Sequence, residues 1–132
     1  LNYTDYNSGR SPILTGLGTQ DGFRGTEASI KNGFDNIEAI IGSQHTDSIK
    51  GLNETAVWSL GGTGCGYSLG GRALNLTDVE DLIGGSAGDT FRLAEGAAHT
   101  GSIQGGTGID CLDYSNCTTS ITVNLLTGTV RA

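Results

Sequence analysis

Acidic side chains beside glycines are the residues of this chain with the clearest potential for chemistry. Among 132 residues there are fourteen Asp and Glu against seven Lys and Arg, a formal charge of −7, and four of the nine Asp residues lie within two positions of a glycine. Carboxylate and carbonyl oxygens at such turns are ligands that a hard cation such as Ca²⁺ prefers. The alternative is an acidic surface that only keeps the protein in solution. A duplex nucleic acid is excluded as a partner, because it would need a basic stripe.

A hydrolase-like pattern also occurs in the sequence. Residues 66–70 spell G-x-S-x-G, the nucleophile elbow, and Asp81, Asp89 and then His99 follow in the order of an α/β-hydrolase. That elbow needs a strand, a sharp turn and a helix within a parallel sheet covered by helices. The chain is too short for that fold and lacks helical patterns, and glycine-rich segments with serine produce the motif by chance. We therefore predict no catalytic residues and a protein that is not an enzyme.

The three cysteines do not form a C-x-x-C pair, so neither a zinc site nor a thioredoxin-like motif is indicated. Cys111 and Cys117 flank a five-residue stretch. If that stretch turns a corner, their Cβ atoms could approach to disulfide distance. Cys65 would then be free or pair between chains. The alternative is three buried thiols.

Four asparagines begin the glycosylation pattern N-x-S/T: Asn2, Asn53, Asn75 and Asn116. Whether they carry sugar depends on the host. Asn53 and Asn75 are the two that we expect in loops.

Internal repeats organise the chain on two scales. The segment Ile37–Gly42 reappears 42 positions later as Val79–Gly84. With an offset of 111, Leu1-Asn2-Tyr3-Thr4 resembles Leu112-Asp113-Tyr114-Ser115, so that residues 112–132 resemble the start of the chain, residues 1–16. Residues 1–132 are therefore interpreted as a single window of a tandem array with a period of about 111 residues and uncapped ends.

A shorter pattern recurs within this period. Residues 105–113 fit G-G-x-G-x-D-x-U-x at every fixed position, and residues 84–92 fit it with one glycine displaced. Weaker copies begin at Gly42 and at Gly61, the second with Gly66 where Asp belongs. The spacing of about 20 residues is typical of one coil of a β-solenoid, in which short strands are joined by tight corners.

Composition and periodicity agree on an all-β fold. Glycine provides 23 of the 132 residues, far above the usual ~7%, which suits short strands with sharp corners. We predict a parallel β-solenoid, β-roll-like or β-helix-like, with coils of about 20 residues. Trp58 is expected in the core rather than as a sugar platform, and no apolar run reaches the ~20 residues of a membrane span. The expected strands are 56–60, 79–83, 90–93, 111–114 and 120–125, and residues 27–31 could form a short helix.

Several phrases carry a family resemblance: VEDLIGGSAGDTF, GSIQGGTGIDCLDYS and TTSITVNLLTGTV, with FDNIEAIIGS and AVWSL upstream. In these phrases the chain resembles the degenerate haemolysin-type (RTX-like) calcium-binding repeats of giant bacterial secreted and surface proteins. The resemblance implies an extracellular or cell-surface location and a parallel β-roll or β-helix core. It also implies that the glycine corners and their Asp residues bind Ca²⁺ between adjacent coils.

Carried over residue by residue, the resemblance makes Asp47, Asp89 and Asp110 side-chain ligands of Ca²⁺. It adds the carbonyl oxygens of four corner residues, Gly84, Ser86, Gly105 and Thr107. The family has two motifs per coil, whereas this chain has one per ~20 residues, and Gly66 cannot supply a carboxylate. The alternative is that the Asp side chains cap corner amides as Asx-turns, which requires no metal.

Three functions follow as expectations. The leading one is a structural spacer or fibre-forming module whose copies stack head to tail, because the open ends of such a fold present unpaired strand edges. The second is a calcium-dependent adhesin or carbohydrate-binding module that contacts a surface polysaccharide. The third is the repeat tail of a secreted enzyme.

Overall fold

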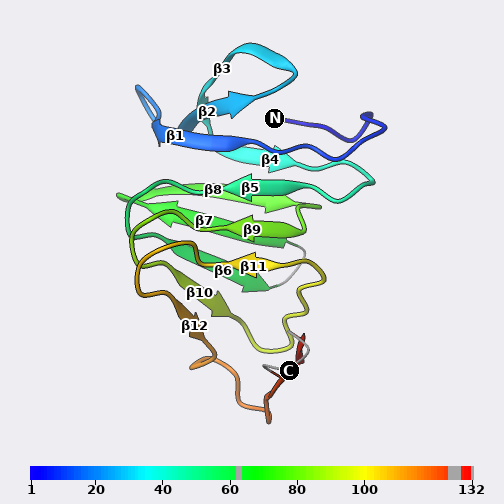
Figure 1. Cartoon of the computed structure of the whole chain (residues 1–132), viewed down its shortest axis with the longest axis vertical. Coiled ribbons are helices and arrows are strands. Elements are labelled where there is room, and N and C mark those ends of the chain that lie inside the picture. The colour runs from blue at the N-terminus through cyan, green and yellow to red at the C-terminus, as the bar shows by residue number, and fades with distance from the viewer. Residues whose placement is uncertain (62–63, 125–128, 132) are drawn as a thin grey trace.

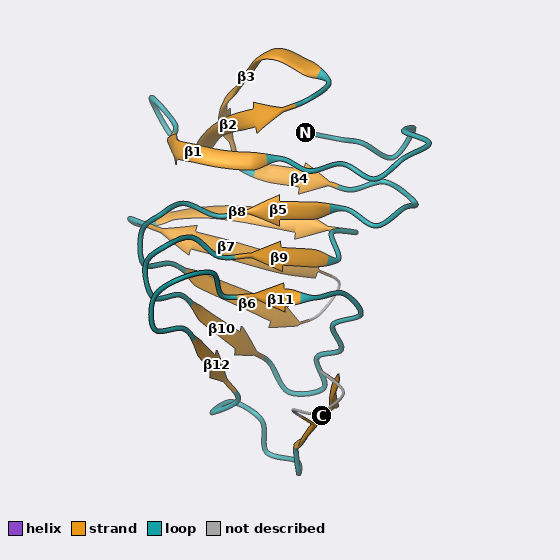
Figure 2. Cartoon of the chain, viewed as in Figure 1, coloured by secondary structure: helices purple, strands orange, loops and turns teal. Residues whose placement is uncertain are grey.

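The structure is a computed structural model that describes residues 1–61, 64–124 and 129–131. These residues form fourteen β-strands and no helix (Figure 2). The all-β prediction is therefore confirmed, and residues 27–31 form the end of one strand and the start of the next. The described part of the chain contains no helix that is long and apolar enough to cross a membrane.

Two six-stranded sheets face each other and enclose the core (Figure 1). Sheet A has the order β12 (Cys111–Asp113), β10 (Thr90–Leu93), β6 (Val57–Gly61), β7 (Gly64–Leu69), β8 (Arg72–Thr77) and β4 (Ala39–Ile41). Sheet B has the order β11 (Ile103–Gln104), β9 (Asp81–Ile83), β5 (Ser48–Lys50), β1 (Ile13–Leu17), β2 (Phe23–Glu27) and β3 (Ile30–Ile37). A separate antiparallel pair joins β13 (Thr122–Asn124) to β14 (Thr129–Arg131).

The prediction of a parallel β-solenoid is wrong, because both sheets mix parallel and antiparallel pairs. In sheet B, β1 pairs antiparallel with β2, and β2 with β3. In sheet A, β6, β7 and β8 form an antiparallel meander. The sequence pattern missed these hairpins because an antiparallel strand alternates buried and exposed residues just as a parallel edge strand does.

Four of the parallel strand pairs fall into two groups with equal separations along the chain, whereas β4–β8 and β1–β5 are separated by 36 and 37 residues. Strand β10 pairs with β12, and β9 with β11, at a separation of 21 residues. Strand β6 pairs with β10, and β5 with β9, at 33 residues. The difference of 12 residues corresponds to the hairpin strands β7 and β8, which lie between β6 and β9 in sequence. The ~20-residue spacing in the sequence therefore corresponds to the pairs β10–β12 and β9–β11, because no hairpin is inserted between the strands of these pairs.

Two kinds of corner connect the sheets. The B-to-A corners, residues 51–56, 84–89 and 105–110, lead from sheet B to sheet A, and the A-to-B corners, residues 42–47, 78–80 and 94–102, lead back. Figure 1 shows the two kinds on opposite edges of the molecule. The similar segments 37–42 and 79–84 therefore contribute strands to different sheets, since β4 lies in sheet A and β9 in sheet B.

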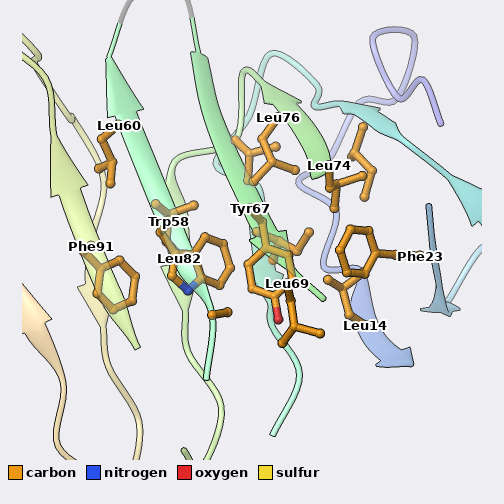
Figure 3. Close-up of a cluster of buried hydrophobic side chains, with 14 of the residues drawn as sticks. Leu14, Phe23, Trp58, Leu60, Tyr67, Leu69, Leu74, Leu76, Leu82 and Phe91 are labelled. Atoms are coloured by element: carbon orange, nitrogen blue, oxygen red, sulfur yellow. The ribbon is translucent and has the colours of Figure 1, made fainter. Parts of the chain in front are cut away.

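Aromatic rings from both sheets fill the centre of the core (Figure 3). Trp58 of β6 is fully buried, stacks on Phe91 at a centroid distance of 5.6 Å and meets Tyr67 edge-on at 4.5 Å. Phe23 of β2 meets Tyr67 edge-on at 5.3 Å. Burying rings of this size supplies a large part of the hydrophobic stabilisation. The expectation that Trp58 belongs to the core is confirmed.

The expected strands agree with the observed ones to within two residues at most ends. Strands β6, β9, β10 and β12 fall on the predicted segments 56–60, 79–83, 90–93 and 111–114. The prediction for 120–125 corresponds to β13, and Leu125 lies outside the described residues. Residues 90–93 and 120–125 were recognisable because they place apolar side chains at alternate positions.

Tyr67 makes the stability of this core sensitive to alkaline pH. Burial raises the pKa of Tyr67 to about 12, although the Leu52 N–H, which donates to its hydroxyl at 3.1 Å, offsets part of the shift. The folded state therefore retains the phenol proton at a pH where the unfolded chain has lost it. Consequently, the free energy of unfolding should fall as the pH rises from about 10 towards 12.

Tyr67→Phe should abolish the part of the alkaline loss of stability that Tyr67 causes. At neutral pH it should lower the free energy of unfolding by about 1 kcal/mol, because the Leu52 N–H loses its acceptor. Urea unfolding at neutral and alkaline pH measures both effects, with Tyr6→Phe, at a partly exposed ring, as the matched control. A Tyr67→Phe protein that retained the full alkaline loss would contradict the assignment.

Candidate functional site

Two carboxylates, the buried one of Asp89 and the exposed one of Asp110, bind the backbone at the B-to-A corners. The side chain of Asp89 is 1% exposed. One of its oxygens accepts the Gly85 N–H within its own corner at 2.9 Å, and the other accepts the Ala56 N–H of the preceding corner at 3.1 Å. Asp110 repeats the second contact, since its Oδ1 accepts the Asp89 N–H at 2.9 Å. Each carboxylate thus caps a corner amide that has no strand partner.

Asp47 performs the same role at the opposite edge of the molecule, in an A-to-B corner. Its Oδ2 accepts the Ser43 N–H at 2.6 Å and its Oδ1 accepts the Arg10 N–H at 2.5 Å. The Asp47 N–H in turn donates to Oε2 of Glu80 at 2.8 Å. The alternative that the sequence left open, Asp side chains capping corner amides, describes the observed contacts of Asp47 and Asp89.

The predicted calcium ligands do not come together. Asp47 lies at one edge of the molecule, whereas Asp89 and Asp110 lie at the other. Gly66, which was aligned with the corner Asp positions, lies inside β7 opposite Ser59 and not at a corner. The described residues contain no group of three or more His, Cys, Asp or Glu side chains that could hold a metal ion.

The four predicted carbonyl ligands belong to the two corners that carry Asp89 and Asp110. The Gly84 N–H donates to the Gln104 carbonyl at 2.7 Å, and the Thr107 N–H donates to the Gly85 carbonyl at 3.2 Å. Ser86 and Thr107 are exposed, and Gly105 lies beneath the Asp110 carboxylate. Ca²⁺ takes six to eight oxygen ligands, whereas both oxygens of Asp89 already accept amides. Asp47, at the opposite edge, therefore cannot share one Ca²⁺ ion with Asp89 and Asp110.

The environment of Asp89 disfavours its charged form. Burial raises the pKa of Asp89, the hydrogen bonds from Gly85 and Ala56 lower it in part, and the negative charge of Asp110 raises it further. Both oxygens accept amides in the ionised form, because a protonated carboxyl carries its proton on one of them. The two amide hydrogen bonds therefore offset part of the cost of burying the charge.

Glycine at the start of the corners that carry Asp47 and Asp89 permits this close approach of backbones. A Cβ at Gly84 would lie 2.1 Å from the Gly105 carbonyl oxygen and 2.5 Å from Oδ2 of Asp89. A Cβ at Gly42 would lie 1.7 Å from the Asp78 carbonyl oxygen and 2.7 Å from Oδ2 of Asp47. Both positions therefore require glycine for space.

Sequence reasoning missed a polar cluster that anchors the N-terminal segment. Arg10 forms an ion pair with the buried carboxylate of Glu27, and its guanidinium lies over the Tyr6 ring at 4.6 Å from the centroid. Tyr3 is buried beside them. Arg10 and Glu27 are 17 positions apart and share no motif, so no local signal could have paired them. Glu80, which accepts the Asp47 N–H, likewise shares no local sequence motif with Asp47.

The predicted disulfide is not formed, because all three cysteines are free. Cys111 lies on the exposed side of β12, whereas the thiol of Cys117 lies 3.8 Å from the carbonyl oxygens of Leu93 and Ala94. The two side chains thus occupy different environments. Cys65 lies in β7 and is half-buried, and burial raises the pKa of its thiol.

All four glycosylation-pattern asparagines are exposed. Asn53 lies in a corner and Asn116 in a turn, whereas Asn2 forms an isolated bridge with Ile41. The expectation that Asn75 lies in a loop is wrong, because it lies in the middle of β8, paired with Gly66 and Ala39.

The hydrolase-like segment forms no elbow. Gly66 and Ser68 lie in β7, and the Ser68 hydroxyl donates to the Val57 carbonyl at 3.3 Å. A groove of about 680 Å³ crosses sheet A nearby. Polar side chains in its lining are those of Ser59, Cys65, Asn75, Thr77, Arg92 and Asn116. These groups can form hydrogen bonds with a polar ligand.

No family model matches the chain, and comparisons with curated proteins and with solved structures gave no match either.

Asp89→Asn should destabilise the fold, because an amide supplies one acceptor where two backbone N–H groups need one each. The unmatched N–H should cost roughly 1–3 kcal/mol in the free energy of unfolding. Chemical denaturation measures the loss, with Asp21→Asn at an exposed turn as the matched control. Equal stability of the two variants would contradict the capping role.

Gly84→Ala should be more damaging than Gly66→Ala. The first methyl would collide with the Gly105 carbonyl oxygen, whereas the second would find its nearest neighbour at 3.9 Å. We expect a loss of about 1–3 kcal/mol for Gly84→Ala, typical of overpacking, and a change within about 0.5 kcal/mol for Gly66→Ala. Thermal unfolding of both variants tests the expectation, and a neutral Gly84→Ala would show that the corners can separate without loss.

Proposed function

We propose that this chain is a structural module of an extracellular repeat protein, and that its copies stack head to tail as spacer or fibre units. The observation that carries the proposal is a local structure that occurs twice. Residues 1–6 and 112–117, which are similar in sequence, adopt the same arrangement at the two ends of sheet A.

Three hydrogen-bonding features are shared by these segments. The Thr4 N–H donates to Oδ1 of Asn2 at 2.9 Å, and the Ser115 N–H donates to Oδ1 of Asp113 at 2.9 Å.

A turn follows in each case. The Tyr6 N–H donates to the Tyr3 carbonyl at 3.0 Å, and the Cys117 N–H donates to the Tyr114 carbonyl at 2.9 Å. The hydroxyls of both tyrosines are buried without a hydrogen-bond partner among the described residues. A sequence repeat with an offset of 111 is thus accompanied by a structural one.

The two segments hold corresponding places at opposite ends of the same sheet. Residues 1–3 lie beside β4 and form a parallel bridge with it between Asn2 and Ile41. Residues 112–113 belong to β12, the strand at the far end of sheet A. A sheet that carries the same structural element at both of its ends can be continued by another copy without a change of pattern.

The chemistry of the corners supports a structural function. The carboxylates of Asp47 and Asp89 are occupied by backbone amides, and the space between the sheets is filled by a hydrophobic core. An extracellular location rests on the family resemblance in the sequence. Calcium gating remains the specific alternative, because Asp89 and Asp110 occupy successive corners of one edge.

We expect the purified protein to form elongated particles whose length increases with concentration, in Ca²⁺ and in EGTA alike, because its corner carboxylates already have amide partners. Analytical ultracentrifugation and electron microscopy measure the particles, while far-ultraviolet circular dichroism follows the β-structure in the same samples.

A protein that remained monomeric at every concentration, with or without Ca²⁺, would contradict head-to-tail stacking. β-Structure or assembly that appeared with Ca²⁺ and vanished in EGTA would instead identify a calcium-gated module. Asp89→Asn and Asp110→Asn would then show which corner is responsible.

A further inference from the structure

The exposed edge of β12 is the surface whose features most closely specify a binding partner. In sheet A, β12 pairs with β10 and is the last strand of the sheet among the residues that the structure describes. Leu112 is 41% exposed there, and Ile109 in the adjoining corner is 93% exposed. An exposed strand edge with apolar side chains is a template for another strand.

The hydrogen-bonding groups of this edge match those that residues 1–3 use at the other end. The Leu1 amino group donates to the Ala39 carbonyl at 2.6 Å, the Ile41 N–H donates to the Leu1 carbonyl at 2.8 Å, and the Tyr3 N–H donates to the Ile41 carbonyl at 2.9 Å. Leu112 and Tyr114 are the counterparts of Leu1 and Tyr3.

The counterpart groups face the free side of β12. The Cys111 N–H donates to the Asp89 carbonyl, towards β10. Because backbone groups of successive residues in a strand alternate in direction, the amides of Leu112 and Tyr114 point away from β10. They are therefore placed to make the bonds that Leu1 and Tyr3 make with β4.

We propose that β12 of one copy of this chain pairs in parallel with β4 of a second copy, in the place that residues 1–3 of the second copy occupy in the isolated molecule. This strand exchange rests on the proposed head-to-tail function and specifies its contact. The hydrogen bonds that are lost with residues 1–3 are replaced one for one, and Leu112 gains the cover that Leu1 has.

The exchange fixes a register. Asn2 lies opposite Ile41, so Asp113 would lie opposite Ile41 of the second copy, and Cys111 opposite its Ala39. Both Cys111 and Ala39 are exposed. Within one chain these two residues lie on the first and last strands of sheet A, five strand spacings or about 24 Å apart. A disulfide between these positions can therefore form only between two copies.

The test uses the full chain with Ala39→Cys, oxidised by diamide after assembly. We expect a covalent dimer on a non-reducing gel, and peptide mapping should identify the link between position 39 and Cys111. Ala39→Cys combined with Cys111→Ser should lose that link. Asn75→Cys is the matched control, because Asn75 is an exposed position beside Ala39, one strand further from the joint.

Two tyrosine variants in the Ala39→Cys background separate exchange from simple end-to-end contact. Tyr3→Ala loosens the strand that must leave β4, so the yield of the 39–111 link should rise severalfold. Tyr114→Ala weakens the strand that replaces it, so the yield should fall severalfold. Circular dichroism confirms that each variant is folded.

Assembly without the 39–111 link, or with equal linking of Asn75→Cys, would overturn the exchange while leaving head-to-tail stacking in place. Tyrosine variants that changed the yield in the same direction would also overturn it. Absence of both assembly and link would overturn the exchange and the proposed function together.

Discussion

Several backbone amides in or near the corners have no backbone acceptor, and carboxylates from a later part of the chain satisfy them. Asp89 holds the Ala56 N–H, Asp110 holds the Asp89 N–H, and Asp47 holds the Arg10 N–H. Two sheets this close together can be connected only by tight turns, whose buried amides would be costly without acceptors. The glycines at the corner starts and the aromatic core between the sheets both depend on these turns keeping their shape.

Sheet A accommodates an interruption without losing this pattern. The hairpin of β7 and β8 adds two antiparallel strands between β6 and β4. Parallel pairing resumes on both sides, from β6 to β10 and from β8 to β4. The added strands also contribute to the core, since Tyr67, Leu74 and Leu76 are buried. The hairpin is therefore an integral part of the hydrophobic interior.

Local features of the fold were accessible from the sequence, and long-range ones were not. Gly84 and Asp89 form one local motif, so their corner could be located, and the similar segments Leu1–Thr4 and Leu112–Ser115 make the same side-chain contact to the backbone. The edge of the molecule at which a corner lies depends on the number of strands that precede the corner. A sequence repeat does not contain this information. For this reason Asp47 was grouped with Asp89. The pairing of Arg10 with Glu27 depends on the β1–β2 hairpin, which the pattern did not reveal.

Four carboxylate caps share a direction along the chain. In each of them the amide receives its acceptor from a residue later in the sequence: Arg10 from Asp47, Asp47 from Glu80, Ala56 from Asp89, and Asp89 from Asp110. The Ser102 N–H, by contrast, receives its acceptor from the earlier Asp81. A chain leaving the ribosome would therefore carry these four amides without their caps until the later carboxylates had been synthesised.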